Sequence, residues 1–117
     1  MKLTTVTIMP KDCKKAIEFF AKICGLRIVN EIKNEYVDIK FLGHDEDFTV
    51  IEIVDTGENQ EKDLSSLSLI FEKDRKLEDI KKMAQDLGFK ASDIKDIPPK
   101  PKFIEIKGPC GINIEFM

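Results

Sequence analysis

The sequence predicts an α+β fold made of two tandem βαβββ modules within one domain. Three observations support this prediction. Short segments alternate apolar and polar residues, as β-strands do, and two longer segments repeat apolar residues at helical spacing. The order strand, helix and three strands occurs twice along the 117 residues. A chain of this length can form a single domain around a hydrophobic core, here expected to span 1–117.

The first module is expected to cover about residues 1–56. Residues 3–9 (LTTVTIM) alternate and are rich in β-branched side chains, so they predict a strand. Asp12 is a suitable N-cap for a helix over 13–24, which Gly25 would end. The remaining elements are predicted strands at 26–32, 36–42 and 48–54, the last two joined by a polar turn at 43–47.

The second module is expected to cover about residues 64–117, after a linker without periodicity. It opens with a predicted strand at 64–71 and a helix over 75–87, which Gly88 would end. The remaining elements are a weak strand at 89–94, a rigid proline-rich loop at 98–101, and strands at 102–107 and 112–117.

The two modules match each other residue by residue. LTTVTI (3–8) matches LSSLSL (64–69), hydroxyl against hydroxyl and aliphatic against aliphatic. In the closing strands, VIEIV matches NIEFM, which pairs Glu52 with Glu115. Several such matches in one order and at nearly constant offset indicate an internal repeat.

Charge and composition exclude several classes of partner. The net charge of −3 and a pI of about 5.3 give no general attraction to nucleic acid or anionic membranes. No apolar run approaches the ~20 residues that a membrane-spanning helix needs. The three cysteines show no CxxC spacing, which is typical of a protein of the reducing cytoplasm.

Two longer segments carry a resemblance to a known family. LTTVTIMPKDCKKAIEFFAKICGLRIV (3–29) and GPCGINIEF (108–116) resemble the opening strand, Asp-capped helix and closing strand of the vicinal oxygen chelate superfamily. That superfamily includes glyoxalase I, bleomycin and fosfomycin resistance proteins and extradiol dioxygenases. The resemblance implies that the two modules form a concave, barrel-like mixed sheet with helices on its outer face.

The resemblance also implies positions for metal ligands. In metal-dependent members each module supplies one ligand, usually His, from its first strand and one, usually Glu, from its last strand. Here the last-strand positions are Glu52 and Glu115, whereas Thr5 and Ser66 stand at the first-strand positions. The one histidine, His44, lies outside all four. We therefore expect no cofactor, or at most a weakly held hard divalent ion on the two glutamates.

The resemblance implies a small-molecule-binding protein of the glyoxalase/bleomycin-resistance type. We expect it to form a homodimer and to sequester a drug or metabolite without chemistry. One alternative is a metal-dependent, glyoxalase-like lyase or isomerase using Glu52 and Glu115. Another is a dimerising structural domain without a ligand. A plainer alternative for the two glutamates is pairing with Lys40 and Lys107 on neighbouring strands. The predicted pocket residues are Thr5, Met9, Tyr36, Glu52, Ser66, Phe103, Glu115 and Met117.

Overall fold

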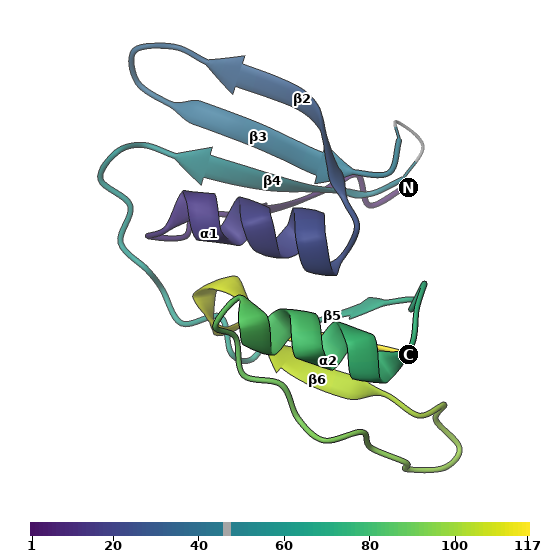
Figure 1. The fold of residues 1–117 in the computed structure, drawn as a ribbon. Coiled ribbons are helices and arrows are strands. Elements are labelled where there is room, and N and C mark those ends of the chain that lie inside the picture. Colours follow the sequence, from purple (N-terminus) through teal and green to yellow (C-terminus); the bar gives the residue numbers. More distant parts are fainter. Residues whose placement is uncertain (46–47) are drawn as a thin grey trace. The chain divides into compact units, whose positions relative to one another are not determined.

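The computed structural model describes residues 1–45 and 48–117, so the end of the polar turn at 43–47 lies outside the described residues. The chain divides into two compact units, Met1–Lys62 and Asp63–Met117, each with its own sheet and helix (Figure 1). The predicted α+β class with two modules is confirmed, with one sheet in each unit. The first unit has the full βαβββ order, and the second has the order β5-α2-β6-β7.

The first unit contains a four-stranded sheet in the order β1-β4-β3-β2. The parallel pair is β1 with β4, and the other neighbours are antiparallel. The elements of this unit are β1 (Thr5–Ile8), α1 (Cys13–Glu18), a π-helical segment (Phe19–Ile23), β2 (Arg27–Lys33), β3 (Asp38–Gly43) and β4 (Val50–Asp55).

The first helix begins where the sequence predicted but changes its winding. The Asp12 carboxylate accepts a hydrogen bond from the Lys15 backbone N–H at 3.0 Å, which is the expected N-cap. After Glu18 the helix widens into the π form, in which the adjacent Phe19 and Phe20 are both fully buried. The wider turn brings successive side chains closer to one face, so both rings can enter the core. No helix in the described ranges is long and apolar enough to cross a bilayer.

The second unit contains a three-stranded sheet in the order β5-β7-β6, with β5 and β7 parallel and β6 antiparallel to β7. Its helix ends just before Gly88, whose φ of 87° is the left-handed conformation expected of a glycine there. The elements of this unit are β5 (Ser68–Phe71), α2 (Leu77–Asp86), β6 (Ile104–Lys107), a 3₁₀ turn (Pro109–Gly111) and β7 (Asn113–Phe116).

The predicted strand at 89–94 is wrong, because this part of the chain forms only isolated bridges to β6. The bridges join Ala91 to Ile106 and Lys95 to Phe103. Ser92 supplies the physical reason: its Oγ accepts the Glu105 backbone N–H at 3.0 Å and donates to the Asp93 carbonyl at 2.8 Å. Such side-chain bonds to the backbone compete with a regular ladder.

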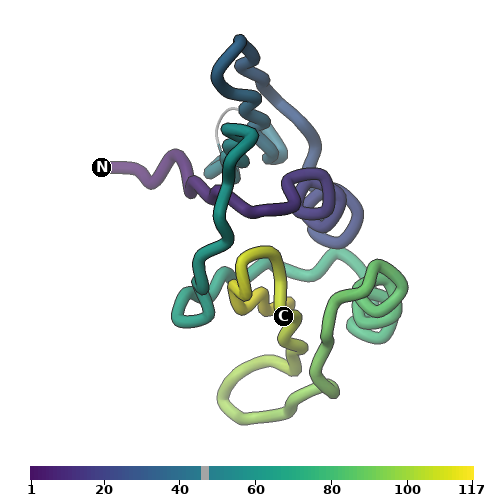
Figure 2. The backbone as a smooth tube through the Cα atoms, turned by 90° about the vertical axis from the view of Figure 1, so that its left-hand side faces the viewer, coloured from purple at the N-terminus to yellow at the C-terminus, as the bar shows by residue number. Residues whose placement is uncertain are grey.

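Each unit buries apolar side chains between its helix and one face of its sheet. Figure 2 shows the two helices as coils beside the strands of their own units. Alternation along the strands leaves the opposite face of each sheet for the polar candidates described below. The first core includes Ile8, Ala16, Phe19, Phe20, Ile23, Leu42, Ile51 and Ile53, and the second Leu77, Ile80, Ala84, Ile104, Ile106, Ile114 and Phe116.

Candidate functional site

The candidate glutamate of the first unit lies on the sheet face opposite α1 and is held by a neighbouring strand. In the parallel pair, Thr7 is the register partner of Glu52, and Thr5 is the partner of Val50. Thr7 Oγ1 donates a hydrogen bond to Glu52 Oε2 at 2.8 Å. Sequence reasoning selected Thr5 and missed Thr7, although alternation places both hydroxyls on one face.

This face also carries apolar side chains that the first unit leaves partly uncovered. Met9 follows β1 directly and is 46% exposed, and Ile32 on β2 is 48% exposed. Phe41, the register partner of Glu52 on β3, is half-buried, as is Val54 on β4. One hydrogen-bonded carboxylate among partly exposed apolar side chains is an arrangement that can contact a small organic molecule.

Lys40 does not neutralise Glu52. Its register partner is Ile53, so its side chain lies on the opposite face of the sheet. There the Lys40 ammonium forms ion pairs with Asp38 and, at 3.0 Å, with Glu31. The hydrogen bond from Lys40 holds the pKa of Asp38 below its usual value, and the same bond raises the pKa of Lys40. The alternative that pairs Glu52 with Lys40 is therefore wrong.

A small cavity lies beside that ion pair, on the helix side of the first sheet. Its volume is about 210 Å³. Asp38, Lys40 and Asp55 line it together with Cys13, Lys14, Ile17 and Ile53. None of the predicted pocket residues lines this cavity, so it is separate from the Glu52 face.

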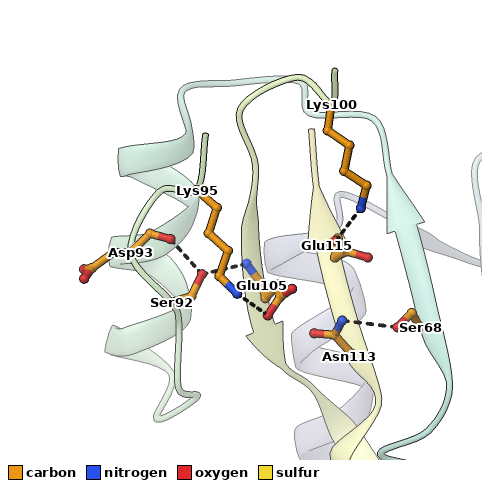
Figure 3. A network of polar contacts seen from close by, with 8 residues as sticks. All are labelled: Ser68, Ser92, Asp93, Lys95, Lys100, Glu105, Asn113 and Glu115. Carbon is orange, nitrogen blue, oxygen red and sulfur yellow. Dashed lines mark hydrogen bonds and ion pairs between the residues drawn. The ribbon is translucent and has the colours of Figure 1, made fainter. Parts of the chain in front are cut away.

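The candidate glutamate of the second unit is almost fully buried and is paired with a lysine from a loop. Glu115 on β7 is 6% exposed. Its register partners are Ile70 on β5 and Glu105 on β6. Lys100 Nζ lies 3.6 Å from Glu115 Oε1 and comes from the segment between α2 and β6 (Figure 3). A buried carboxylate needs such a compensating charge.

Glu105 has its own lysine from the same segment. Lys95 Nζ lies 3.0 Å from Glu105 Oε2 (Figure 3). The two neighbouring carboxylates are therefore compensated by Lys95 and Lys100, neither of which sequence analysis selected. A lysine in an irregular loop has no periodicity that would assign it a partner, so the sequence carries no signal for either pair.

The strand register also corrects which serine of the second unit matches Thr5 of the first unit. Ser66 lies in the turn before β5, outside the sheet. Ser68 is the register partner of Asn113, as Thr5 is of Val50, and the Asn113 side-chain amide donates to Ser68 Oγ at 3.2 Å. Ser68, rather than Ser66, is thus the counterpart of Thr5.

The other predicted pocket residues occupy different environments. Tyr36 is 75% exposed in the turn between β2 and β3. Phe103 is 3% exposed, and the Lys100 ammonium lies 4.8 Å from the centre of its ring. Met117 is half-buried and continues β7, where its backbone N–H donates to Phe71 O at 3.2 Å. Thr5, Met9, Tyr36 and Glu52 belong to the first unit, and Ser66, Phe103, Glu115 and Met117 to the second.

The donors at the predicted ligand positions do not fit a transition-metal centre. The predicted first-strand positions Thr5 and Ser66 offer neutral hydroxyls where imidazole would bind such an ion, and so does Ser68, the counterpart of Thr5. The Glu52 carboxylate already accepts from Thr7, and the Glu115 carboxylate faces the Lys100 ammonium. Within residues 1–45 and 48–117, no group of three or more His, Cys, Asp or Glu side chains is arranged to hold a metal ion.

No family model matches the chain, and no curated protein matches its sequence. Among solved structures, it resembles the trypanothione-dependent glyoxalase I of Leishmania major, with a TM-score of 0.78 and 16% identity over 100% of this chain and 86% of that one. It also resembles TnmS3, an antibiotic-binding protein from Streptomyces sp. CB03234, with a TM-score of 0.71 and 16% identity over 99% of this chain and 93% of that one.

A third similar structure is YycE from Bacillus subtilis, a protein of unknown function described as a candidate glyoxalase or fosfomycin resistance protein. Its TM-score is 0.76 at 17% identity, over 97% of this chain and 86% of that one. These structures belong to the vicinal oxygen chelate superfamily. The chain therefore has the fold that its opening and closing segments predicted.

Proposed function

We propose that this chain is a small-molecule-binding protein of the glyoxalase/bleomycin-resistance type, which sequesters a drug or metabolite without a transition-metal centre. The observation that carries the proposal is the Glu52 face of the first sheet. It combines a fixed acceptor, held by Thr7 at 2.8 Å, with the partly exposed side chains of Met9, Ile32 and Phe41. The similarity to an antibiotic-binding protein supports the same function.

The ligand that this face favours has an apolar body and a cationic or hydrogen-donating group. The apolar side chains contribute through burial, while the Glu52 carboxylate selects a donor. We further propose that the two modules act as one domain, that two chains pair as a homodimer, and that the protein works in the cytoplasm, where its three cysteines stay reduced.

The test is a titration of the full chain with bleomycin and other cationic antibiotics, followed by amide NMR. We expect shifts that centre on β1 and β4, and Met9→Ser should weaken the affinity about tenfold. Ile97→Ser is the matched control, because Ile97 is also exposed, at 55%, but lies in the second unit. Absence of binding across the panel, or equal effects of both variants, would contradict the proposal.

A metal-dependent lyase of the glyoxalase type is the second candidate, supported by the likeness to a glyoxalase I at a TM-score of 0.78. Metal analysis of protein purified without chelator separates the two. Stoichiometric Ni, Zn, Mn or Fe that is lost in both Glu52→Gln and Glu115→Gln would favour the lyase. Light scattering of the same samples reports whether two chains pair.

A further inference from the structure

Glu115 and its lysine carry an inference that rests on the proposed function. Glu115 is a charged residue with only 6% of its surface exposed, yet its partner atom, Lys100 Nζ, is 3.6 Å away. That separation is longer than a charge-assisted hydrogen bond of about 2.7–2.9 Å. The carboxylate is therefore compensated in charge but weakly bonded.

The adjacent pair provides an internal reference. Glu105 is the register partner of Glu115, so the two carboxylates stand side by side on one face. Like charges at such positions repel each other, and each needs a cation. Lys95 contacts Glu105 at 3.0 Å, whereas Lys100 stands farther from Glu115. Of the two lysines, Lys100 is the more weakly held.

The backbone around Lys100 lets its side chain leave without unfolding the loop. The loop is anchored at Lys95, whose backbone N–H and C=O both bond to Phe103, at 2.8 and 3.0 Å. A turn then bonds the Lys100 N–H to the Ile97 carbonyl at 3.0 Å. Neither anchor involves the Lys100 side chain, which is 49% exposed. Rotation of this side chain alone would therefore open the route to Glu115.

The surroundings of the Lys100 ammonium resemble a binding site for an amphiphilic cation. The ammonium lies 4.8 Å from the centre of the Phe103 ring, a cation–π distance. Ile70, the register partner of Glu115 on β5, is 58% exposed on the same face. The Lys100 ammonium thus lies between a carboxylate and an aromatic ring, and an exposed aliphatic side chain stands beside that carboxylate.

We infer that Lys100 is an internal competitor, whose ammonium occupies the place on Glu115 that the cationic group of a ligand would take. Binding of a primary ammonium or guanidinium group exchanges one cation for another and uncovers Phe103 for the apolar part of the ligand. Lys100 thereby sets the selectivity of this face, because a neutral ligand cannot displace it without leaving Glu115 uncompensated.

The experiment uses the full chain and two probes of matched shape, the cation 2-phenylethylamine and the neutral 2-phenylethanol. Amide NMR titration gives the dissociation constant for each. Lys100→Met should bind the amine about fivefold more tightly, the change expected from removing a partly exposed ion pair worth about 1 kcal/mol. Lys82→Met is the charge-matched control, because Lys82 is exposed on α2, and it should match the wild type. Adding Glu115→Gln to Lys100→Met should abolish the preference for the amine.

Unchanged or weaker amine binding by Lys100→Met overturns the inference, and so does an equal gain in Lys82→Met, which would reflect only the lost positive charge. No amine binding by either protein also overturns it. Circular dichroism checks folding, and Lys100→Gln replaces Lys100→Met if the latter unfolds. The proposed function fails separately, in the Met9→Ser titration. Antibiotic binding at β1 and β4 without amine binding at Glu115 would refute this inference alone.

Discussion

The two units place a glutamate at the same position of the closing strand but compensate it in different ways. In the first unit Thr7 lies opposite Glu52 and donates a hydrogen bond at 2.8 Å. In the second unit Ile70 lies opposite Glu115, and a loop lysine compensates the charge from 3.6 Å. One residue of the opening strand thus decides whether the carboxylate is bonded by its own sheet or depends on a distant segment.

The difference has a consequence for each face. The Glu52 carboxylate is held by a neutral hydroxyl rather than by a lysine. The Glu115 carboxylate is buried and already balanced by Lys100, so a cation must compete for it. The two matched glutamates therefore stand in different electrostatic environments.

The largest expected effect comes from creating a cavity in the core of one unit. Ile80 on α2 is 1% exposed, and Ile80→Ala should lower the free energy of unfolding by about 2–5 kcal/mol. Hydrogen exchange should show the loss mainly in residues 63–117. Leu67→Ala, at a position that is 39% exposed, is the control and should have a small effect. An equal loss of protection in both units would show that they unfold together.

A reciprocal exchange tests the role of the opening strand. Thr7→Val removes the hydroxyl that donates to Glu52 while keeping the side-chain shape. It should lower the free energy of unfolding, measured in urea, by about 1 kcal/mol. Ile70→Thr places a hydroxyl opposite Glu115, on an exposed position where little apolar burial is lost. We expect it to stabilise the second unit and to reduce the cost of Lys100→Met. A destabilising Ile70→Thr would mean that register alone does not bring the hydroxyl to the carboxylate.

The smallest expected effect is the pH dependence of the partly buried Asp38–Lys40 pair on the helix side of the first sheet. Lys40 holds the pKa of Asp38 below its usual value of 3.8. Asp38 therefore contributes stability above pH 3.8, and this contribution is lost as the pH falls through the lowered pKa. Carboxyl NMR should show Asp38 titrating below 3.8, and Lys40→Met should return it toward that value. If Lys40→Met left the titration midpoint of Asp38 unchanged, Lys40 would not be the cause of the lowered pKa.

Local patterns predicted most of the architecture. Alternation located the strands, Asp12 and Gly88 marked helix ends, and the repeat matched Glu52 with Glu115. The site residues stay a prediction. Sequence analysis selected both glutamates, but not Thr7 and Lys100, which contact them, or Ser68, the counterpart of Thr5. The repeat aligned LTTVTI with LSSLSL, two residues away from the equivalence that strand pairing gives. Serine occurs at both alternatives, so the sequence could not distinguish them.

The sequence by itself determined the two modules, the order of their elements and the two matched glutamates, because periodicity and turn residues act over a few neighbouring positions. Only the tertiary structure decided which residue faces each glutamate. Strand register depends on hydrogen bonds to a strand far along the chain, and it sets Thr7 against Glu52 and Ile70 against Glu115. The partner of the buried carboxylate comes from a loop, and a long lysine side chain can reach several acceptors. The three-dimensional path of that loop selects one, which places Lys100 on Glu115.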